Sequence, residues 1–260
     1  MNTKKRILQV ENLAKTYGTG AGKTEALKSI TFDVLEGEFL GIMGASGSGK
    51  TTLLNCIATM LKPTSGRIIL RGKDISGFRG GKLADYRGKE IGYLFQEFEL
   101  LDNLTARENI MLPLSLHGVT AKTAEPDIQS MAAMLDITNV LDKFPAQMSG
   151  GQKQRVAAAR ALISDPGIVL ADEPTGALDS RNSKTLMDKL AEINRDQNKT
   201  IMMVTHDANA ASYCSRIIFI QDGCLFHELR RNTASESTAA FYDRIVTVMA
   251  QLGGGSANVL

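Results

Sequence analysis

The sequence has almost no excess charge of either sign. Its 260 residues contain 30 Lys and Arg against 28 Asp and Glu, which leaves a formal net charge of only +2. The short basic start, Lys4-Lys5-Arg6, does not extend into the broad basic stripe that a nucleic-acid-binding surface requires. We therefore expect no nucleic-acid partner, and we interpret these three residues as a solvated terminus.

Cysteine is scarce as well. The three cysteines, Cys56, Cys214 and Cys224, form no C-x-x-C pair, and any disulfide pairing would leave one of them over. This number and spacing are typical of reduced thiols in a cytosolic protein, and they argue against a disulfide framework or a zinc site.

Long apolar runs are also missing. No run in the sequence approaches the roughly 20 residues that a membrane-spanning helix needs. Glu11 and Lys15 interrupt the weak apolar stretch near the N-terminus, so we expect no signal peptide. If the protein works at a membrane, another protein must hold it there.

Strand-like and helix-like segments alternate along most of the chain, which predicts a mostly parallel α/β sheet. The predicted strands are 7–13, two strands within 29–44 around the Glu36-Gly37 turn, 66–72, 91–95, 167–172, 200–206, and a hairpin over 216–229. Predicted helices follow residue 52 as far as Lys62-Pro63, cover 186–196, and place Phe241, Ile245, Val248 and Leu252 on one face before a flexible end at 253–258.

The pattern changes between about Glu97 and Gln147. Apolar residues recur there at helical spacing, and Pro113, Gly118 and Pro126 break the pattern. We interpret this stretch as a helical insert. Its apolar face is suited either to docking another protein or to forming a small core of its own.

A phosphate-binding loop is the clearest motif. Gly44, Ala45, Ser46, Gly47, Ser48, Gly49, Lys50 and Thr51 match G-x-x-x-x-G-K followed by Ser or Thr, after an apolar strand and before a helix. Backbone N–H groups of such a loop surround phosphates, the lysine reaches the β- and γ-phosphates, and the Thr51 hydroxyl ligates Mg²⁺. Gly22-Lys23-Thr24 repeats three letters, but Tyr17 stands where the first glycine is needed, so we expect a surface loop there.

Asp172 and Glu173 end an apolar strand, and Pro174 then turns the chain away. An aspartate at this sheet edge is suited to holding Mg²⁺, and a neighbouring carboxylate is suited to polarising an attacking water. Taken alone, the three residues would equally fit a plain acidic turn. Together with the phosphate loop, they favour catalysis.

His206 and Gln96 each follow an apolar strand. By itself a histidine there is more often structural, and a strand-terminal glutamine is usually a capping or solvated group.

A second glycine-rich loop, MSGGQKQR (148–155), opens an alanine-rich helix. Ser149 is suited to capping that helix, but Gly150 and Gly151 lower helix stability and so require a reason. Two interpretations fit the residues. Either the loop is only a helix cap, or its N–H groups contact a phosphate bound by another molecule.

The ordered motifs resemble the nucleotide-binding subunit of an ABC transporter over nearly the whole chain. They are Tyr17, GASGSGKTT, Gln96, MSGGQ, LADEP, Ala177-Leu178-Asp179 and His206. The resemblance implies a P-loop NTPase (RecA-like) core with an antiparallel β subdomain over 1–96 and 161–230. It also implies a helical subdomain over 97–160, which contains the signature loop MSGGQ (148–152), and a C-terminal helix and tail over 231–260.

The same resemblance implies ATP and Mg²⁺ as ligands and a role for each matching residue. Tyr17 stacks on adenine, the loop 44–52 including Thr52 binds the nucleotide, and Thr51, Gln96 and Asp172 serve the metal. Glu173 orients the water, His206 contacts the γ-phosphate, and Gln96 also senses the membrane partner. Ser149, Gly150, Gly151 and Gln152 cover the ATP of a second copy, and Asp179 lies at the interface of this homodimer. Met148 replaces the usual leucine, a change of similar volume with little expected effect.

The chain lacks the additions that mark ABC ATPases of DNA repair or translation. The segments FQEFELLDNLTARENIMLPL and ADEPTGALDS resemble the macrolide-export and lipoprotein-release subfamily, and AASYCSRIIFIQDG resembles its bacitracin- and lantibiotic-resistance type. This implies an ATPase at the cytoplasmic face of the membrane, held by a separate permease that docks near Gln96 and the insert, sometimes with a sensor kinase. The expected function is antimicrobial-peptide resistance. Gating of a permease for envelope signalling, or lipoprotein or macrolide handling, remain alternatives.

Overall fold

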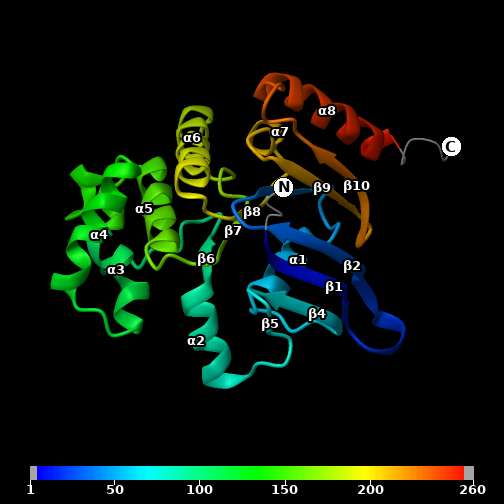
Figure 1. Ribbon diagram of the computed structural model, residues 1–260, viewed down its shortest axis with the longest axis horizontal. Helices are drawn as coiled ribbons and strands as arrows, with labels where there is room; N and C mark the ends of the chain where they lie inside the picture. Colours follow the sequence, from blue (N-terminus) through cyan, green and yellow to red (C-terminus); the bar gives the residue numbers. More distant parts are fainter. Residues whose placement is uncertain (1–4, 255–260) are drawn as a thin grey trace.

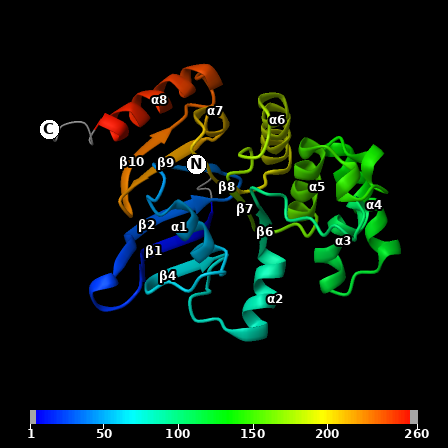
Figure 2. The same cartoon turned by 180° about the vertical axis from the view of Figure 1, so that it is seen from behind.

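The computed structural model describes residues 5–254 (Figures 1 and 2). A larger sheet lies in the middle, three helices gather at one end, and a smaller sheet lies toward the other end. Lys4 of the predicted basic start and residues 255–258 of the predicted flexible end lie outside the described residues, whereas Gly253 and Gly254 belong to the last helix. Within 5–254, no helix combines the length and apolarity needed to cross a bilayer.

The larger sheet has six strands in the order β10-β9-β3-β8-β7-β6. Five strands run parallel, and β10 returns beside β9 as an antiparallel edge strand. Parallel strands end at a common edge, so the loops that follow β3, β6, β7 and β8 meet there. The strands are β3 (Phe39–Met43), β6 (Ile91–Leu94), β7 (Ile168–Asp172), β8 (Ile201–Val204), β9 (Arg216–Gln221) and β10 (Cys224–Arg230).

Both faces of the five parallel strands are buried, which explains why these strands are almost continuously apolar, whereas the edge strand β10 is mostly exposed. In β8, Ile201 and Met203 belong to one core, and Met202 and Val204 belong to the other. The first core lies under the helices that follow residue 105, and the other joins the large sheet to the small one.

The smaller sheet is antiparallel, in the order β2-β1-β4-β5. Its first two strands are longer than predicted, because β1 runs to Tyr17 and β2 starts at Thr24, with shifts of register between them. In the look-alike segment Gly22-Lys23-Thr24, the first two residues lie in the connection between these strands, as expected for a surface loop, but Thr24 begins β2. The strands are β1 (Arg6–Tyr17), β2 (Thr24–Leu35), β4 (Ser65–Leu70) and β5 (Lys73–Asp74).

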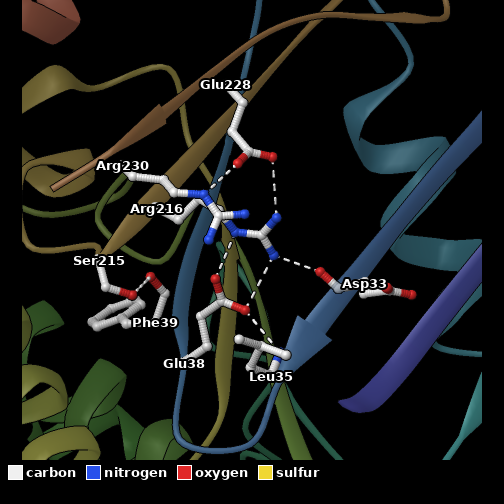
Figure 3. Close-up of polar contacts among 8 residues, drawn as sticks. All are labelled: Asp33, Leu35, Glu38, Phe39, Ser215, Arg216, Glu228 and Arg230. Atoms are coloured by element: carbon white, nitrogen blue, oxygen red, sulfur yellow. Dashed lines mark hydrogen bonds and ion pairs between the residues drawn. The ribbon is translucent and has the colours of Figure 1, made fainter. Parts of the chain in front are cut away.

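A buried ion network joins the two sheets (Figure 3). Arg216 of β9 donates to Glu38 at 2.6 and 3.1 Å and to Glu228 of β10 at 3.1 Å, and it also donates to the backbone carbonyl of Asp33 in β2. Arg216 and Glu38 are 6% and 7% exposed. Removing one partner would leave the other charge buried and unpaired, so the network holds β2 in place against β9 and β10.

Helices cover the large sheet and fill the space beside it. The helix α1 lies between the two sheets, because its Leu53, Leu54 and Ile57 join the core that they share. The helices are α1 (Lys50–Ile57), α2 (Gly80–Glu90), α3 (Ala106–Leu116), α4 (Ala121–Met134), α5 (Gly150–Leu162), α6 (Ser180–Gln197), α7 (Ala208–Ala211) and α8 (Thr238–Gly254). Three single turns are η1 (Gly20–Gly22), η2 (Thr138–Val140) and η3 (Pro145–Gln147).

The predicted helical insert is present, but the prolines do not divide it. Pro113 lies inside α3 and Pro126 lies inside α4, and only Gly118 falls in the connection between these helices. Each proline removes one backbone hydrogen bond. Ile110 and Leu114, on either side of Pro113, pack into the same core, and this packing offsets the loss.

Two other helix predictions were incomplete. The helix after the phosphate loop ends at Ile57 and not at Lys62-Pro63, because Thr59 adopts a left-handed backbone conformation with φ 61°. The helix α2 was not predicted, since its glycine-rich and polar sequence carries only Tyr86 as a buried residue. The C-terminal helix was predicted correctly, and its Phe241 and Ile245 are fully buried.

Candidate functional site

The phosphate loop leaves β3 and enters α1 in a space too narrow for side chains at two glycines. A Cβ atom at Gly44 would lie 2.1 Å from the carbonyl oxygen of Ile220, and one at Gly49 would lie 2.4 Å from that of Ala26. Gly49 also has φ 104°, in the region that disfavours other residues. These glycines therefore let the loop sit directly between β2 and β9.

Lys50 is the first residue of α1 and lies inside the loop. Its ammonium group donates to the carbonyl oxygens of Gly44 at 2.9 Å and Ala45 at 2.8 Å. Burial lowers the pKa of Lys50, and the nearby charges of Glu173 and Asp172 act in the opposite direction. Burial therefore disfavours the charged form of Lys50, and the two carboxylates favour it.

A cleft of about 710 Å³ opens over the loop, a size typical of ligand-binding sites. Glu173 and His206 line it from the neighbouring strands, and Met249 and Leu252 line it from α8. The remaining lining residues are Ala26, Met43, Gly44, Ala45, Ser46, Gly47, Gly49, Lys50, Thr51 and Thr52. None of the described residues 149–152 of the same chain lines this cleft.

Asp172, the last residue of β7, carries a carboxylate oxygen (Oδ1) that is buried without a hydrogen-bond partner in the protein. Burial, and then the charge of Glu173, raises the pKa of Asp172, while Tyr93, Lys50 and Thr51 lower it. A buried carboxylate oxygen of this kind is costly unless a cation or an ordered water satisfies it. Hydroxyl and carboxylate oxygens, such as those of Thr51 and Asp172, are suitable ligands for Mg²⁺.

Glu173 follows in a left-handed backbone conformation with φ 45°. Its N–H donates to the carbonyl of Val204 at 2.9 Å, and its Oε2 lies 3.1 Å from Nδ1 of His206. A left-handed conformation at a residue other than glycine costs of order 1–3 kcal/mol. The strain thus falls on Glu173, the residue predicted to orient the attacking water. The same conformation places Glu173 beside His206.

Gln96 lies beside the loop that follows Glu173. A Cβ at Gly176 would be 2.8 Å from the side-chain nitrogen of Gln96, and the N–H of Gly176 donates to the carbonyl of Glu173 at 2.9 Å. Tyr17 lies at another rim of the site, 43% exposed, with its hydroxyl 3.4 Å from that of Thr52.

The second glycine loop caps its own helix. Ser149 Oγ accepts from the N–H of Gln152 at 3.3 Å, and the Gln152 side chain accepts from the N–H of Ser149 at 2.9 Å. A Cβ at Gly151 would lie 2.0 Å from Oδ1 of Asn182, whereas one at Gly150 would meet nothing closer than 3.8 Å. Packing within the chain therefore explains one of the two glycines.

Asp179 caps α6 through the same Asn182. It accepts from the Asn182 N–H at 2.8 Å and from the Asn182 side chain at 2.6 Å. Hydrogen bonds from the backbone and side chain of Asn182 lower the pKa of Asp179. Asn182 thus joins Asp179 to the signature loop, a link that sequence reasoning missed, although an aspartate such as Asp179 is a common N-cap and signals a helix start.

The family model described as "ABC transporter" matches residues 18–176. The chain is 47% identical to the bacitracin export ATP-binding protein BceA of Halalkalibacterium halodurans, over 95% of this chain and 97% of that protein. It is 48% identical to the ABC transporter ATP-binding protein YxdL of Bacillus subtilis, over 96% of each chain.

Among solved structures, the chain is similar to the dimeric, post-hydrolysis ATP-binding cassette MJ0796 bound to ADP and Pi. The TM-score is 0.79 with 38% identity, over 86% of this chain and 98% of that one. A protein of the same name belongs to Methanocaldococcus jannaschii. With the phosphate loop and the Glu173–His206 pair lining one cleft, and a buried aspartate directly before Glu173, this chain belongs to the ABC transporter family as an ATP-binding subunit and ATPase.

Proposed function

We propose that this chain hydrolyses ATP to power resistance to antimicrobial peptides of the bacitracin or lantibiotic type, through a separate permease. The observation that carries the proposal is its 47% identity to a bacitracin export ATP-binding protein, which this chain covers over 97% of its length. A match along nearly the whole of both chains favours a shared task more strongly than a shared domain does.

The cleft residues divide the work of holding Mg-ATP. Tyr17 stacks on adenine, loop N–H groups and Lys50 bind the phosphates, and Thr51 and Asp172 hold Mg²⁺, with Gln96 as a further metal-side group. When bound, Mg²⁺ neutralises negative charge on the phosphate oxygens. The unpartnered oxygen of Asp172 supports this assignment.

Glu173 orients the attacking water and accepts its proton. His206, 3.1 Å away, holds the Glu173 carboxylate and contacts the γ-phosphate. Because Glu173 and His206 are both present in every copy, we expect both sites of a homodimer to hydrolyse ATP.

A second copy completes each site. The described residues of the cleft include none from 149–152, which favours coverage by Ser149, Gly150, Gly151 and Gln152 of another chain. Asp179 lies at this interface. The similar cassette MJ0796, which is dimeric with ADP and Pi, supports a head-to-tail homodimer here.

The permease docks on the helical part near Gln96 and holds the chain at the cytoplasmic face of the membrane. Exposed apolar side chains gather in this part of the sequence, with Leu101, Leu116 and Phe144 48%, 83% and 44% exposed. A sensor kinase is a further candidate partner of the assembly, and nucleic acid is not.

The test is a resistance profile in the native strain. Glu173→Gln should sensitise cells selectively to bacitracin and lantibiotics, and not to macrolides or a neutral detergent. Glu192→Gln, which changes an exposed carboxylate of α6, is the matched control. An unchanged peptide profile would favour lipoprotein handling or envelope signalling, and macrolide sensitivity would favour macrolide export.

A further inference from the structure

We infer that Gln154 of α5 is a positioning residue for ATP hydrolysis, because its side chain ties together the two loops that carry Gln96 and Glu173. The Gln154 side chain is fully buried. Its amide nitrogen donates to the carbonyl of Phe95 at 3.0 Å and to the carbonyl of Pro174 at 2.7 Å. Phe95 directly precedes Gln96, and Pro174 directly follows Glu173.

The two bonds use the full donor capacity of one amide group. A primary amide nitrogen carries two hydrogens, and each reaches a different loop. The Gln154 side-chain oxygen is buried without a protein partner, so only the donor side of the amide holds neighbouring backbone. No carboxylate or apolar side chain of the same size could donate both bonds.

A second contact from α5 secures the loop beyond Gln96. Phe98 and Glu99 are consecutive residues with left-handed backbones, at φ 62° and 49°. The guanidinium of Arg160 donates to the carbonyl of Phe98 at 2.9 Å and to the carbonyl of Glu99. A strained turn persists only where its surroundings hold it, and here one arginine contacts both strained residues.

The same helix begins at the signature loop. Ser149 caps α5, and Gly151 packs against Asn182 beside Asp179. A shift of α5 would therefore move the signature loop and the backbone next to Gln96 and Glu173 together. We assign Gln154 the task of keeping these groups in register, which rests on the proposed roles of Gln96 and Glu173.

Asn109 shows what a purely structural amide does in this chain. It is also fully buried, and its two amide N–H groups are shared among the carbonyls of Leu101, Leu104 and Thr105, all in the connection before its own helix α3. Asn109 thus stabilises local structure in the helical part. Gln154 instead bonds two segments 20 and 59 residues away in sequence.

The experiment compares Gln154→Glu and Gln154→Met with Asn109→Asp in the purified full-length chain. Steady-state ATP hydrolysis, equilibrium binding of a fluorescent ATP analogue with Mg²⁺, and thermal unfolding are measured for each variant. We expect both Gln154 variants to lose at least about tenfold in kcat while the nucleotide Kd changes less than about threefold, because misplacement affects the transition state more than binding. Asn109→Asp should lower the unfolding temperature and leave kcat unchanged.

Arg160→Lys is a second variant that tests the tie between α5 and the Gln96 loop if neither Gln154 variant folds. Lysine keeps the charge but lacks the fork that spans two carbonyls, so kcat should fall with binding retained. Wild-type kcat in the Gln154 variants would overturn the inference, as would an equal loss of kcat in Asn109→Asp. Glu173→Gln is measured alongside: if it hydrolyses ATP normally, the proposed catalytic role of Glu173 fails, whatever the Gln154 variants show.

Discussion

The phosphate loop and the signature loop each open a helix, α1 and α5, and these helices treat their first N–H groups in opposite ways. No side chain caps α1, which begins after Gly49 and opens onto the 710 Å³ cleft. In contrast, Ser149 and Gln152 cap each other's N–H groups at the start of α5. The first turn of a helix carries N–H groups without partners inside the helix, so these differences decide what each end can bind.

The comparison separates a helix end that is open to a ligand from one that the chain itself largely caps. At α1, no side chain caps the first N–H groups, and Lys50 lines the cleft together with Glu173, an arrangement that suits phosphate binding. At α5, the cap uses one donor and Asn182 closes the space beside Gly151. Gly150 is then the glycine of this loop at which a Cβ would have room.

Removing the ammonium group of Lys50 should have the largest effect. We expect Lys50→Ala to lower kcat/KM for ATP by at least about 100-fold, as loss of one stabilising group in an active site commonly does. Lys23→Ala, in the look-alike segment between β1 and β2, is the matched control and should leave hydrolysis unchanged. Equal losses in both variants would contradict the assignment of phosphate binding to the loop of Lys50 and not to the segment of Lys23.

Blocking hydrolysis should show whether the signature loop at the start of α5 contacts a second copy when ATP is bound. Glu173→Gln should lower kcat by about 100-fold or more and trap an ATP-dependent dimer, because the amide cannot accept a proton from water. Light scattering with ATP measures the dimer, and Glu192→Gln serves as the control. A persistent monomer, without or with the permease, would contradict completion of the site by a second copy.

The two signature glycines should respond differently to alanine. Gly151→Ala forces a Cβ to 2.0 Å from Asn182 and should cost about 1–3 kcal/mol in the free energy of unfolding, measured with urea. The cost should shrink in a double variant with Asn182→Ala. Gly150→Ala should unfold like the wild type yet hydrolyse ATP more slowly, and a stable, fully active Gly150→Ala would disagree with contact across the dimer.

The smallest effect is expected at the cap itself. Ser149→Ala should lower the free energy of unfolding by about 1 kcal/mol, the usual value of a lost N-cap. Ser130→Ala, at an exposed position inside α4, should leave stability unchanged or raise it slightly. Chemical denaturation of both variants measures the difference, and equal stabilities would show that the α5 cap contributes nothing.

Much of the fold was predictable because its strands follow simple rules. β3, β7 and β8 are short apolar runs, and each ends at or just before residues of a motif, so both their burial and the shared edge of the site follow from the sequence. The helix α2 escaped prediction because only Tyr86 of its residues is buried. The prediction that Pro113 breaks the helical pattern was wrong for the opposite reason, since the packing of α3 outweighs the tendency of proline to end a helix.

The sequence by itself determined the chemistry of this protein, because the order and spacing of the phosphate loop, Asp172, Glu173 and His206 are properties of the chain. Only the tertiary structure decided which groups meet across distant segments. It brought Nδ1 of His206 to 3.1 Å from Glu173, set Asn182 against Gly151, and placed the Gln154 amide between Phe95 and Pro174. Such contacts depend on how helices pack against a sheet, and side-chain packing carries no fixed spacing along the chain.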